Sequence, residues 1–361
     1  MRQSKPKRIS GVLLLVLLAV YLLGFPRGTG QELQLLPQWV SDVSPAAPAG
    51  NNAQGAGRQQ SGSARAFRLG DRFGYLDRDG TLLLSEAVLY DVTLTDNRFA
   101  NYSEVSQTVV IQDPAGSIIG TIDAEGYPLF LGELSVLLHP DGVTVSQWRS
   151  DGARLWRYSV PAAFSAIDAA ADVTLIGAID GRLIALDQSG GELLQYRSRS
   201  GRLPVVAAAA LSSDAALAAA VLDIDPQRVA LFERSETGYE LSTELELPDS
   251  LRRPLLLQFA FSDRTLLWEQ RDGLGGLRIG SRRRFELPLD GAVSGFADIP
   301  EMQLLAVITR DEDAMLLLQP PYSRPIIRLP LPHGDTFVRV DGRNLLLGVQ
   351  DRVASYRLER G

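Results

Sequence analysis

The chain has 361 residues, of which 45% are hydrophobic and 22% charged, with a formal net charge of −7 and no cysteine. These are the proportions of a globular protein, and the acidic balance argues against a nucleic-acid partner, which requires a basic face. The absence of cysteine excludes disulfides, thiolate nucleophiles, thiolate metal sites and redox pairs.

The N-terminus has the pattern of a membrane-targeting segment. A basic cluster (Arg2, Lys5, Lys7 and Arg8) precedes an uncharged apolar run at residues 9–25. A helix over this run would be about 25 Å long, close to the lower limit for crossing a bilayer. Because no Ala-x-Ala-like cleavage pattern follows, we expect residues 1–27 to be a retained signal-anchor rather than a cleaved signal peptide. The positive-inside rule then makes the protein single-pass in the cytoplasmic (inner) membrane, with its C-terminal domain periplasmic or extracellular.

Residues 28–64 are expected to form an extracytoplasmic linker. Residues 44–64 are rich in proline, alanine, glycine, asparagine and serine and cannot bury enough apolar surface to fold, which is typical of a flexible tether. Residues 31–43 contain several apolar side chains, including Trp39. That stretch fits either a short interfacial helix at the bilayer surface or a continuation of the tether.

From residue 65 to the C-terminus, short apolar runs alternate with turn residues. Glycine supplies the positive φ that a two-residue hairpin requires, so recurrent Asp-Gly and Gly-Gly pairs predict a series of antiparallel hairpins. The Ala-rich stretch 205–221 is the one candidate helix, but Ser212–Asp214 divides it, and two buried strands fit better. The pairs that mark the turns are Asp79-Gly80, Asp141-Gly142, Asp151-Gly152, Asp180-Gly181, Gly190-Gly191, Asp272-Gly273, Asp290-Gly291 and Asp341-Gly342.

The spacing of these turns predicts an all-β fold, a β-propeller of about seven four-stranded blades over residues 65–361. The last unit, 336–360, has only three strands, and the short run Arg65–Leu69 is expected to supply the fourth and close the ring. Splitting the long unit 107–161 would raise the number of blades to eight. The other predicted units are 72–101, 163–199, 203–248, 254–288 and 292–332.

Three hairpins carry a more specific resemblance. Residues 184–194 (IALDQSGGELL), 150–156 (SDGARLW) and, more weakly, 76–83 (LDRDGTLL) resemble the PQQ-like repeat of quinoprotein-type propellers. The Gly-His and Trp-Asp signature of WD40 blades is absent, so the likeness to WD40-like proteins is one of architecture. The resemblance implies a turn that needs glycine and an aromatic residue that packs between adjacent blades.

The resemblance specifies a shape rather than a chemistry. Similar repeats occur in quinone-dependent dehydrogenases, which hold their cofactor with adjacent cysteines and a bound calcium. They also occur in the propeller lipoprotein of the outer-membrane barrel assembly machine, which is anchored by a lipidated cysteine. Because this chain has no cysteine, it has neither the cofactor-binding cysteines of the dehydrogenases nor the lipidated cysteine of the lipoprotein. We expect no cofactor.

The two histidines and the first acidic motif are of residue types that can bind a metal ion. His139 and His333 both lie beside proline in loops, and a surface role fits better than metal ligation or base catalysis. Residues 77–80 (DRDG) look like the start of an EF-hand loop, but position twelve is Val88 instead of glutamate, so a hairpin turn is the better interpretation.

Other charged clusters also favour surface roles. The acidic pair Asp223 and Asp225 and the run 311–313 are expected to be solvated turns rather than calcium sites. The basic runs 252–253 and 282–284 are expected to be solvated edges that discourage aggregation, rather than sites for an anionic ligand or lipid headgroup. No catalytic, cofactor-binding or metal-binding residue is therefore predicted.

Three functional hypotheses follow. The first is a non-catalytic, membrane-anchored propeller that acts as a protein-interaction scaffold, possibly in assembly of the cell envelope. The second is an enzyme or binding protein for a carbohydrate or other small ligand in the central funnel, in which Asp141, Asp180 or Asp335 would be general acids or metal ligands. Convergence of these side chains would favour the enzyme. The third is a structural filler of an envelope complex.

Overall fold

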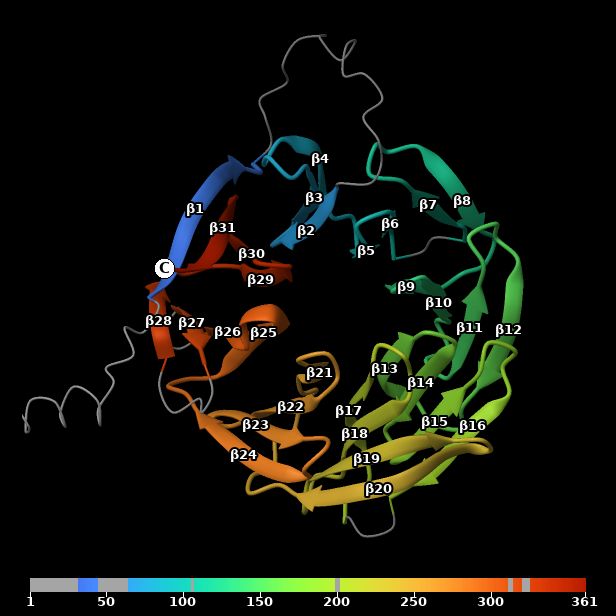
Figure 1. The fold of residues 1–361 in the computed structure, drawn as a ribbon. Coiled ribbons are helices and arrows are strands. Elements are labelled where there is room, and N and C mark those ends of the chain that lie inside the picture. Colours follow the sequence, from blue (N-terminus) through green and yellow to red (C-terminus); the bar gives the residue numbers. More distant parts are fainter. Residues whose placement is uncertain (1–31, 45–63, 105–106, 199–201, 311–313, 320–324) are drawn as a thin grey trace, which may run out of the picture.

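The structure is a computed structural model of the chain, and it describes residues 32–44, 64–104, 107–198, 202–310, 314–319 and 325–361. In these ranges eight antiparallel sheets are arranged as blades around a central axis, so the fold is an eight-bladed β-propeller (Figure 1). The described ranges contain one short 3₁₀ turn, Pro300–Met302. None of their helices has the length and apolar character needed to cross a bilayer. The expected anchor at residues 1–27 lies outside these ranges.

The blades are numbered here in chain order from residue 65. Blade 1 contains β2 (Arg65–Leu69), β3 (Arg72–Leu76) and β4 (Leu82–Ala87). Blade 2 contains β5 (Asp91–Leu94), β6 (Phe99–Tyr102), β7 (Val109–Gln112) and β8 (Ile118–Ile122). Blade 3 contains β9 (Tyr127–Leu131), β10 (Leu134–Leu138), β11 (Thr144–Trp148) and β12 (Arg154–Ser159). Blade 4 contains β13 (Phe164–Ala170), β14 (Val173–Ala178), β15 (Arg182–Leu186) and β16 (Glu192–Arg197).

The second half of the ring follows the same meander. Blade 5 contains β17 (Val206–Leu211), β18 (Leu217–Leu222), β19 (Arg228–Ser235) and β20 (Gly238–Glu246). Blade 6 contains β21 (Leu257–Ala260), β22 (Thr265–Gln270), β23 (Gly273–Arg278) and β24 (Arg283–Pro288). Blade 7 contains β25 (Val293–Ile299), β26 (Leu304–Thr309), β27 (Ala314–Leu318) and β28 (Pro325–Pro330). Blade 8 contains β29 (Thr336–Asp341), β30 (Asn344–Val349), β31 (Arg352–Arg360) and, from the other end of the chain, β1 (Leu33–Asp42).

The predicted blade number of about seven is wrong, and the alternative of eight is correct. The predicted units from residue 163 onward correspond to blades 4–8, and the Ala-rich stretch forms the two strands β17 and β18 as expected. The error lies in the first third of the ring, where the predicted unit 72–101 joins half of blade 1 to half of blade 2. Strands β5, β6 and β7 have only four residues each, so their apolar runs are too short to mark a blade boundary.

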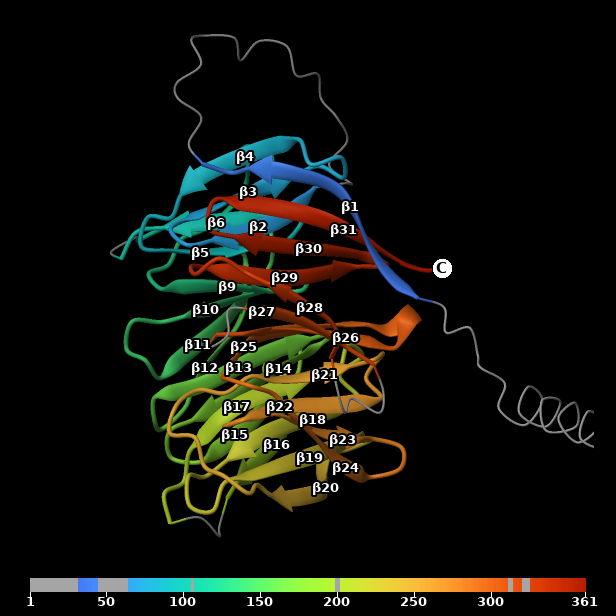
Figure 2. The same ribbon diagram turned by 90° about the vertical axis from the view of Figure 1, so that its left-hand side faces the viewer.

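The ring is closed by β1, not by Arg65–Leu69. Strand β1 pairs antiparallel with β31, from Leu33 opposite Arg360 to Asp42 opposite Arg352. Figure 2 shows β1 lying along β31 at the edge of the ring, with its first residues at the same face as the C-terminus. Leu33 and Leu35 pack on the core between blades 7 and 8. The segment interpreted as an interfacial helix or tether therefore contains a propeller strand.

Trp39 illustrates the packing of the aromatic residue that the PQQ-like resemblance implies. Its indole N–H donates to the Arg78 carbonyl at 2.8 Å, and a Cβ on Gly80 would lie 2.5 Å from its ring. Trp156 sits in the same way against Gly190, where a Cβ would lie 2.8 Å from its own Cβ. Each of these two tryptophans lies on the fourth strand of its blade and packs against the glycine turn of the following blade, as the PQQ-like resemblance implies.

The core is a ring of apolar clusters, each shared by two neighbouring blades. The cluster between blades 8 and 1 includes Phe67 and Leu346, and that between blades 1 and 2 includes Phe73 and Phe99. The Phe73 and Phe99 rings lie 5.1 Å apart. Because every blade buries its faces against both neighbours, stability depends on closure of the whole circle.

A partly buried aspartate also ties neighbouring blades together. The carboxylate of Asp168, in β13, accepts the N–H of Leu211 in blade 5 at 2.7 Å. Burial raises the pKa of Asp168, and the N–H groups of Leu211 and Ala169 oppose that rise only in part. The ionised carboxylate is therefore costly at neutral pH, although its hydrogen bond joins two blades.

We predict that Asp168→Asn stabilises the protein at pH 7, because the amide oxygen keeps the Leu211 hydrogen bond without a partly buried charge. A carboxyl group whose folded-state pKa is raised loses stability as pH rises through that pKa, so the advantage of the variant should shrink as pH falls toward about 4. Thermal melts of both proteins from pH 4 to pH 8 measure the difference. Asp187→Asn is the control and should destabilise the protein at pH 7, since hydrogen bonds from Ser189 lower the pKa of Asp187 and so favour its charged form. A pH-independent difference for Asp168→Asn would contradict the prediction.

Candidate functional site

Blade 1 differs from the other seven blades, because only three strands are described in it. Backbone hydrogen bonds show which positions of a regular four-stranded blade these three strands occupy. In blades 6 and 8 the residue after the fourth strand donates to the turn between the second and third strands, as Leu289 does to Asp272 and Val43 to Asp351. In blade 1, Val88 follows β4 and donates to Asp71, in the turn between β2 and β3, at 2.8 Å.

The next turn gives the same assignment. The Gly80 N–H donates to the Asp77 carbonyl between β3 and β4, as the Gly190 N–H donates to the Asp187 carbonyl between the third and fourth strands of blade 4. Strands β2, β3 and β4 therefore correspond to the second, third and fourth strands of a regular blade. Among the described residues, none takes the innermost strand position of blade 1.

A pair of charged side chains spans this position. Arg339 lies on β29 of blade 8 and Asp96 in the turn after β5 of blade 2, and the guanidinium Nη1 donates to the carboxylate at 2.6 Å. Both side chains also bind the backbone of Ala66 on β2. The Ala66 N–H donates to the Asp96 carboxylate at 2.9 Å, and Arg339 donates to the Ala66 carbonyl at 3.3 Å. These two side chains, the Arg339–Asp96 latch, make hydrogen bonds that a neighbouring strand would otherwise make.

We predict that the latch contributes a coupling free energy of about 1 kcal/mol to folding, because the pair is bidentate but its side chains are 40% and 44% exposed. The test is a double-mutant cycle with Arg339→Met, Asp96→Asn and the double variant, measured by urea unfolding. Asp96→Asn keeps an oxygen acceptor for the Ala66 N–H. A coupling energy of zero would show that the pair does not hold blades 8 and 2 together.

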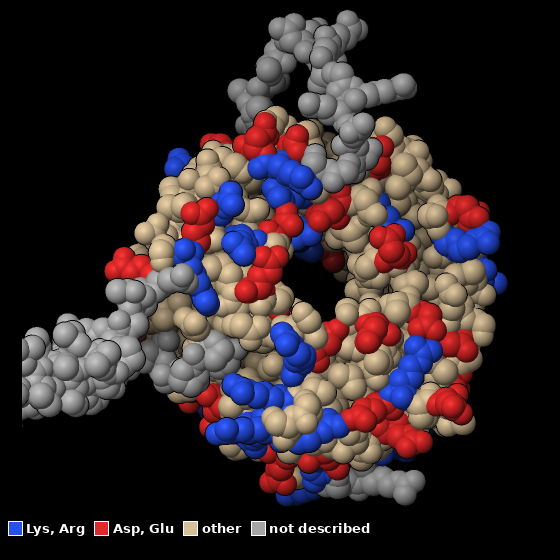
Figure 3. Space-filling model, viewed as in Figure 1, with Lys and Arg blue, Asp and Glu red and all other residues tan. Residues whose placement is uncertain are grey.

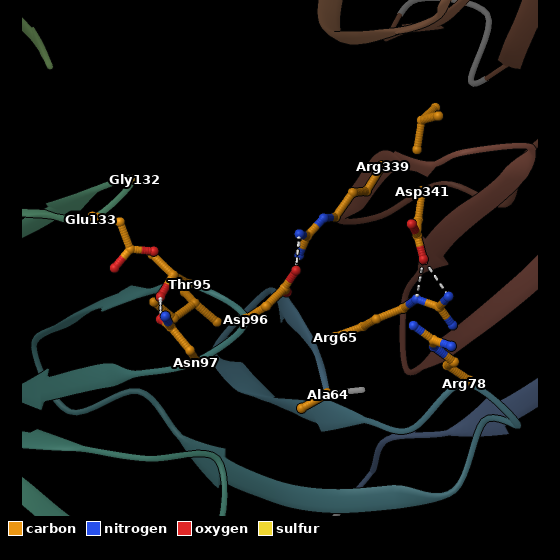
Figure 4. A pocket seen from close by; sticks show the side chains of 12 residues that line it. Ala64, Arg65, Arg78, Thr95, Asp96, Asn97, Gly132, Glu133, Arg339 and Asp341 are labelled. Carbon is orange, nitrogen blue, oxygen red and sulfur yellow. Dashed lines mark hydrogen bonds and ion pairs between the residues drawn. The ribbon is translucent and has the colours of Figure 1, made fainter. Parts of the chain in front are cut away.

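A second ion pair lies beside the latch and helps to line a cavity of about 650 Å³ (Figure 4). The buried guanidinium of Arg65, at the start of β2, donates from Nε to Asp341 at 2.9 Å. Strands and turns of blades 8, 1, 2 and 3 supply the lining: Ala64, Arg65, Arg78, Leu94, Thr95, Asp96, Asn97, Gly132, Glu133, Arg339, Val340 and Asp341. The cavity thus opens where the three-stranded blade meets its neighbours.

The cavity combines charges of both signs. Arg65 and Arg78 both line the cavity, and Figure 4 draws them at one end of it, with Glu133 at the other. Arg65 is paired with Asp341, whereas in the described part of the chain the guanidinium of Arg78 has no acidic partner. Figure 3 shows acidic and basic side chains intermixed around the open central channel. The arrangement suits a polar ligand that presents a carboxylate to Arg78.

The structure does not bring Asp141, Asp180 and Asp335 together. Asp141 accepts the N–H of Thr144 within its own hairpin, and Asp180 pairs with Arg182 at 3.1 Å in another blade. Asp335 precedes β29 and packs against Gly70. Within the described ranges, no three histidine or carboxylate side chains are placed to share a metal ion. These carboxylates are used in turns and between blades.

The histidines and the acidic motifs have separate local roles. His139 Nε2 lies 2.9 Å from Ser146 Oγ, and burial lowers the pKa of His139. The carbonyl of His333 accepts a hydrogen bond from Gln350. Residues 77–80 form the turn between β3 and β4, as predicted. The prediction of a solvated turn is wrong for Asp223, which is fully buried and accepts the Ser198 hydroxyl.

The basic runs contribute to contacts within and between blades. Arg253 pairs with Glu269, whose side chain is almost fully buried in blade 6. Arg282, in the turn before β24, binds Glu233 and Ser242 of blade 5. Arg284 donates to the Glu246 carbonyl of the same blade at 2.9 Å. These arginines are therefore more than a solvated edge, while the acidic run 311–313 lies outside the described residues.

Comparison with known proteins agrees with this architecture. The chain is 26% identical over 246 residues to an uncharacterised protein of Treponema pallidum (strain Nichols), a match that covers 68% of this chain and 65% of the relative. BamB from Moraxella catarrhalis has a similar structure, with a TM-score of 0.60 and 14% identity over 90% of this chain and all of that one. The computationally designed Ika8 protein has a TM-score of 0.61 and 13% identity over 84% of this chain and 98% of its own. At these identities the two structures show the fold alone. A family described as beta-propeller protein matches residues 1–360, and the chain belongs to that family.

Proposed function

We propose that this protein is a membrane-anchored, extracytoplasmic scaffold that binds a protein partner through the propeller, in a role such as assembly of the cell envelope. The observation that carries the proposal is the cavity at blade 1, where several turns meet around a strand position left open among the described residues. Such a surface offers backbone groups and charges to a polypeptide. The carboxylates that were candidates for acid–base chemistry are engaged in turns and between blades instead.

The sequence supports the proposed location. The basic cluster and the apolar run 9–25 have the composition of a signal-anchor, with the C-terminal domain outside the cytoplasmic membrane. Strand β1 begins at Leu33, so residues 26–32 would connect the anchor to the propeller. Seven extended residues reach at most about 25 Å. The proposed scaffold therefore works close to the bilayer.

The test is in-cell crosslinking of the full-length protein followed by mass spectrometry. A second form, in which residues 9–25 are replaced by a cleavable export signal, serves as the comparison. We expect both forms to capture the same partner in stoichiometric amount, because the propeller makes the contact and the anchor only localises it. Recovery of no partner by either form would refute the scaffold function. Recovery by the anchored form alone would show that the propeller is not the binding element.

A further inference from the structure

We propose that the innermost position of blade 1, which no described residue occupies, binds an extended peptide segment of the partner, with a carboxylate at or near the C-terminal end of that segment. This inference rests on the proposed function and adds the site and the chemistry of the bound segment. Three features carry it: the edge of β2, the direction in which a strand would run there, and the cations at one end of the cavity.

The edge of β2 that faces away from β3 is not paired with any other described strand. The N–H and C=O of Ala66 point away from β3, toward Asp96 and Arg339. Because alternate residues of a strand direct their backbone groups to the same edge, those of Arg68 point the same way. Within the described ranges no backbone hydrogen bond is made from Arg68 toward that edge, and its side chain is engaged with Asp91 at 2.7 Å. A free strand edge is a template for another extended chain.

A peptide can pair along the whole of β2 only if it displaces the Arg339–Asp96 latch. The latch holds the hydrogen-bonding groups of Ala66, so a peptide that pairs along all of β2 must take them over. Both side chains of the latch are more than one third exposed, so they can turn toward solvent without leaving a buried charge. The peptide backbone then replaces two side-chain hydrogen bonds with ladder hydrogen bonds. Free Arg339 also becomes available to an acidic group.

The direction of the other innermost strands fixes which end of the peptide meets the cations. Strand β29 ends at Asp341, which pairs with Arg65 at the first residue of β2. A peptide running in the direction of β29 is antiparallel to β2 and ends beside Arg65 and Arg78. Arg78 has no acidic partner in the described part of the chain, and it lines the same end of the cavity as Arg65 (Figure 4). A terminal carboxylate, or an acidic side chain near it, would supply that partner.

The probe is a library of random nine-residue peptides displayed with free C-termini and selected on the full-length protein. We expect recovered peptides to be rich in β-branched residues and to carry acidic residues in the last three positions. Resynthesised peptides should lose about tenfold or more in affinity against Arg78→Ala, since a hydrogen bond between charged groups contributes at least about 1.5 kcal/mol. Arg283→Ala, which removes an exposed arginine of β24, is the matched control and should leave affinity unchanged. C-terminal amidation distinguishes a terminal carboxylate from a side-chain carboxylate.

A blocking experiment locates the site. The chain has no cysteine, so a single exposed cysteine can be labelled selectively. Asn97→Cys carrying a bulky maleimide fills the cavity, whereas the same adduct on Thr237→Cys lies in the turn before β20. Thermal melts confirm that both adducts are folded. We expect the first adduct to weaken peptide binding at least tenfold and the second to have no effect, and bound peptide to slow hydrogen exchange of the Arg68 amide.

Equal binding to both adducts, or selection of no peptide at all, would overturn the inference. The crosslinking experiment keeps this failure separate from failure of the scaffold function. If the Asn97→Cys adduct still captures the partner found with the unmodified protein, the scaffold function stands and the binding site lies elsewhere. If peptide binding is blocked but no partner is captured in cells, the site is correct and the cellular role is wrong.

Discussion

A chain that lacks residues 33–42 should lose the cooperative unfolding transition of the intact propeller. These residues form β1, the fourth strand of blade 8, which pairs along its length with β31 and packs Leu33 and Leu35 into the core. Without them β31 becomes an exposed edge, and blade 8 loses packing against blades 7 and 1. Calorimetric melts of the deleted and intact proteins measure the effect. A transition of unchanged temperature and enthalpy would show that the ring closes in another way.

Point variants on the same strand separate packing from strand pairing. Trp39→Ala should cost about 3 kcal/mol, because it removes an aromatic group that packs against Gly80 and donates to Arg78. Val40 is the next residue and is 62% exposed, so Val40→Ala should cost less than about 0.5 kcal/mol. Urea unfolding gives both values. Equal losses would mean that Trp39 acts only through the backbone of β1.

Gly74→Ala should destabilise the protein by about 3 kcal/mol, a large effect for the addition of one methyl group. Gly74 lies in β3, and a Cβ there would lie 2.0 Å from the Leu84 carbonyl oxygen and 2.9 Å from the Phe67 ring. The first contact is with backbone of the neighbouring strand, which can move only if β3 and β4 separate. Unfolding in urea measures the loss. A change below about 1 kcal/mol would show that blade 1 can widen without losing its strand pairing.

Gly295→Ala is the matched control, since Gly295 also lies in a strand and a Cβ there would meet nothing within 4 Å. At such a position alanine reduces the conformational entropy of the unfolded chain, so we expect a gain of about 0.5 kcal/mol. The opposite signs at two strand glycines would show that close backbone approach, rather than loss of glycine, governs the result at Gly74.

Much of the fold could be predicted from the sequence, because hairpin turns have strong local signals. Of the eight Asp-Gly and Gly-Gly pairs taken as turn markers, all except Asp290-Gly291 lie in a turn within a blade, and the exception joins blades 6 and 7. The closing strand could not be recognised in this way. Strand β1 has no hairpin partner next to it in the chain, and Pro37 lies where its pairing with β31 shifts register. Its partner is at the other end of the sequence, so local patterns give no sign of the pairing.

The candidate site was harder to predict than the fold. Arg339, Asp96 and Arg65 are ordinary charged residues in short strands and turns, and nothing nearby in the sequence connects them. They meet because Asp96 and Arg339, from blades 2 and 8, both bind the backbone of Ala66, while Arg65 on the same strand pairs with Asp341 of blade 8. A charged residue such as Arg339 inside the apolar-alternating run of β29 was the one available signal. Its meaning depended on knowing which strands surround it.

Closure by β1 also has a consequence for the order of folding. Leu33 of β1 pairs with Arg360 of β31. Strand β1 is synthesised before the other described strands, so it cannot pair until β31, the last of them, has been made. Each of blades 2–7 is formed by consecutive stretches of chain and can fold as it emerges, whereas blade 8 cannot be completed until β31 has been synthesised. Until then the edge of β1 is unpaired and open to other chains. A nonsense mutation that removes only β31 would therefore leave the ring open at both ends of the polypeptide and expose the earliest strand to aggregation.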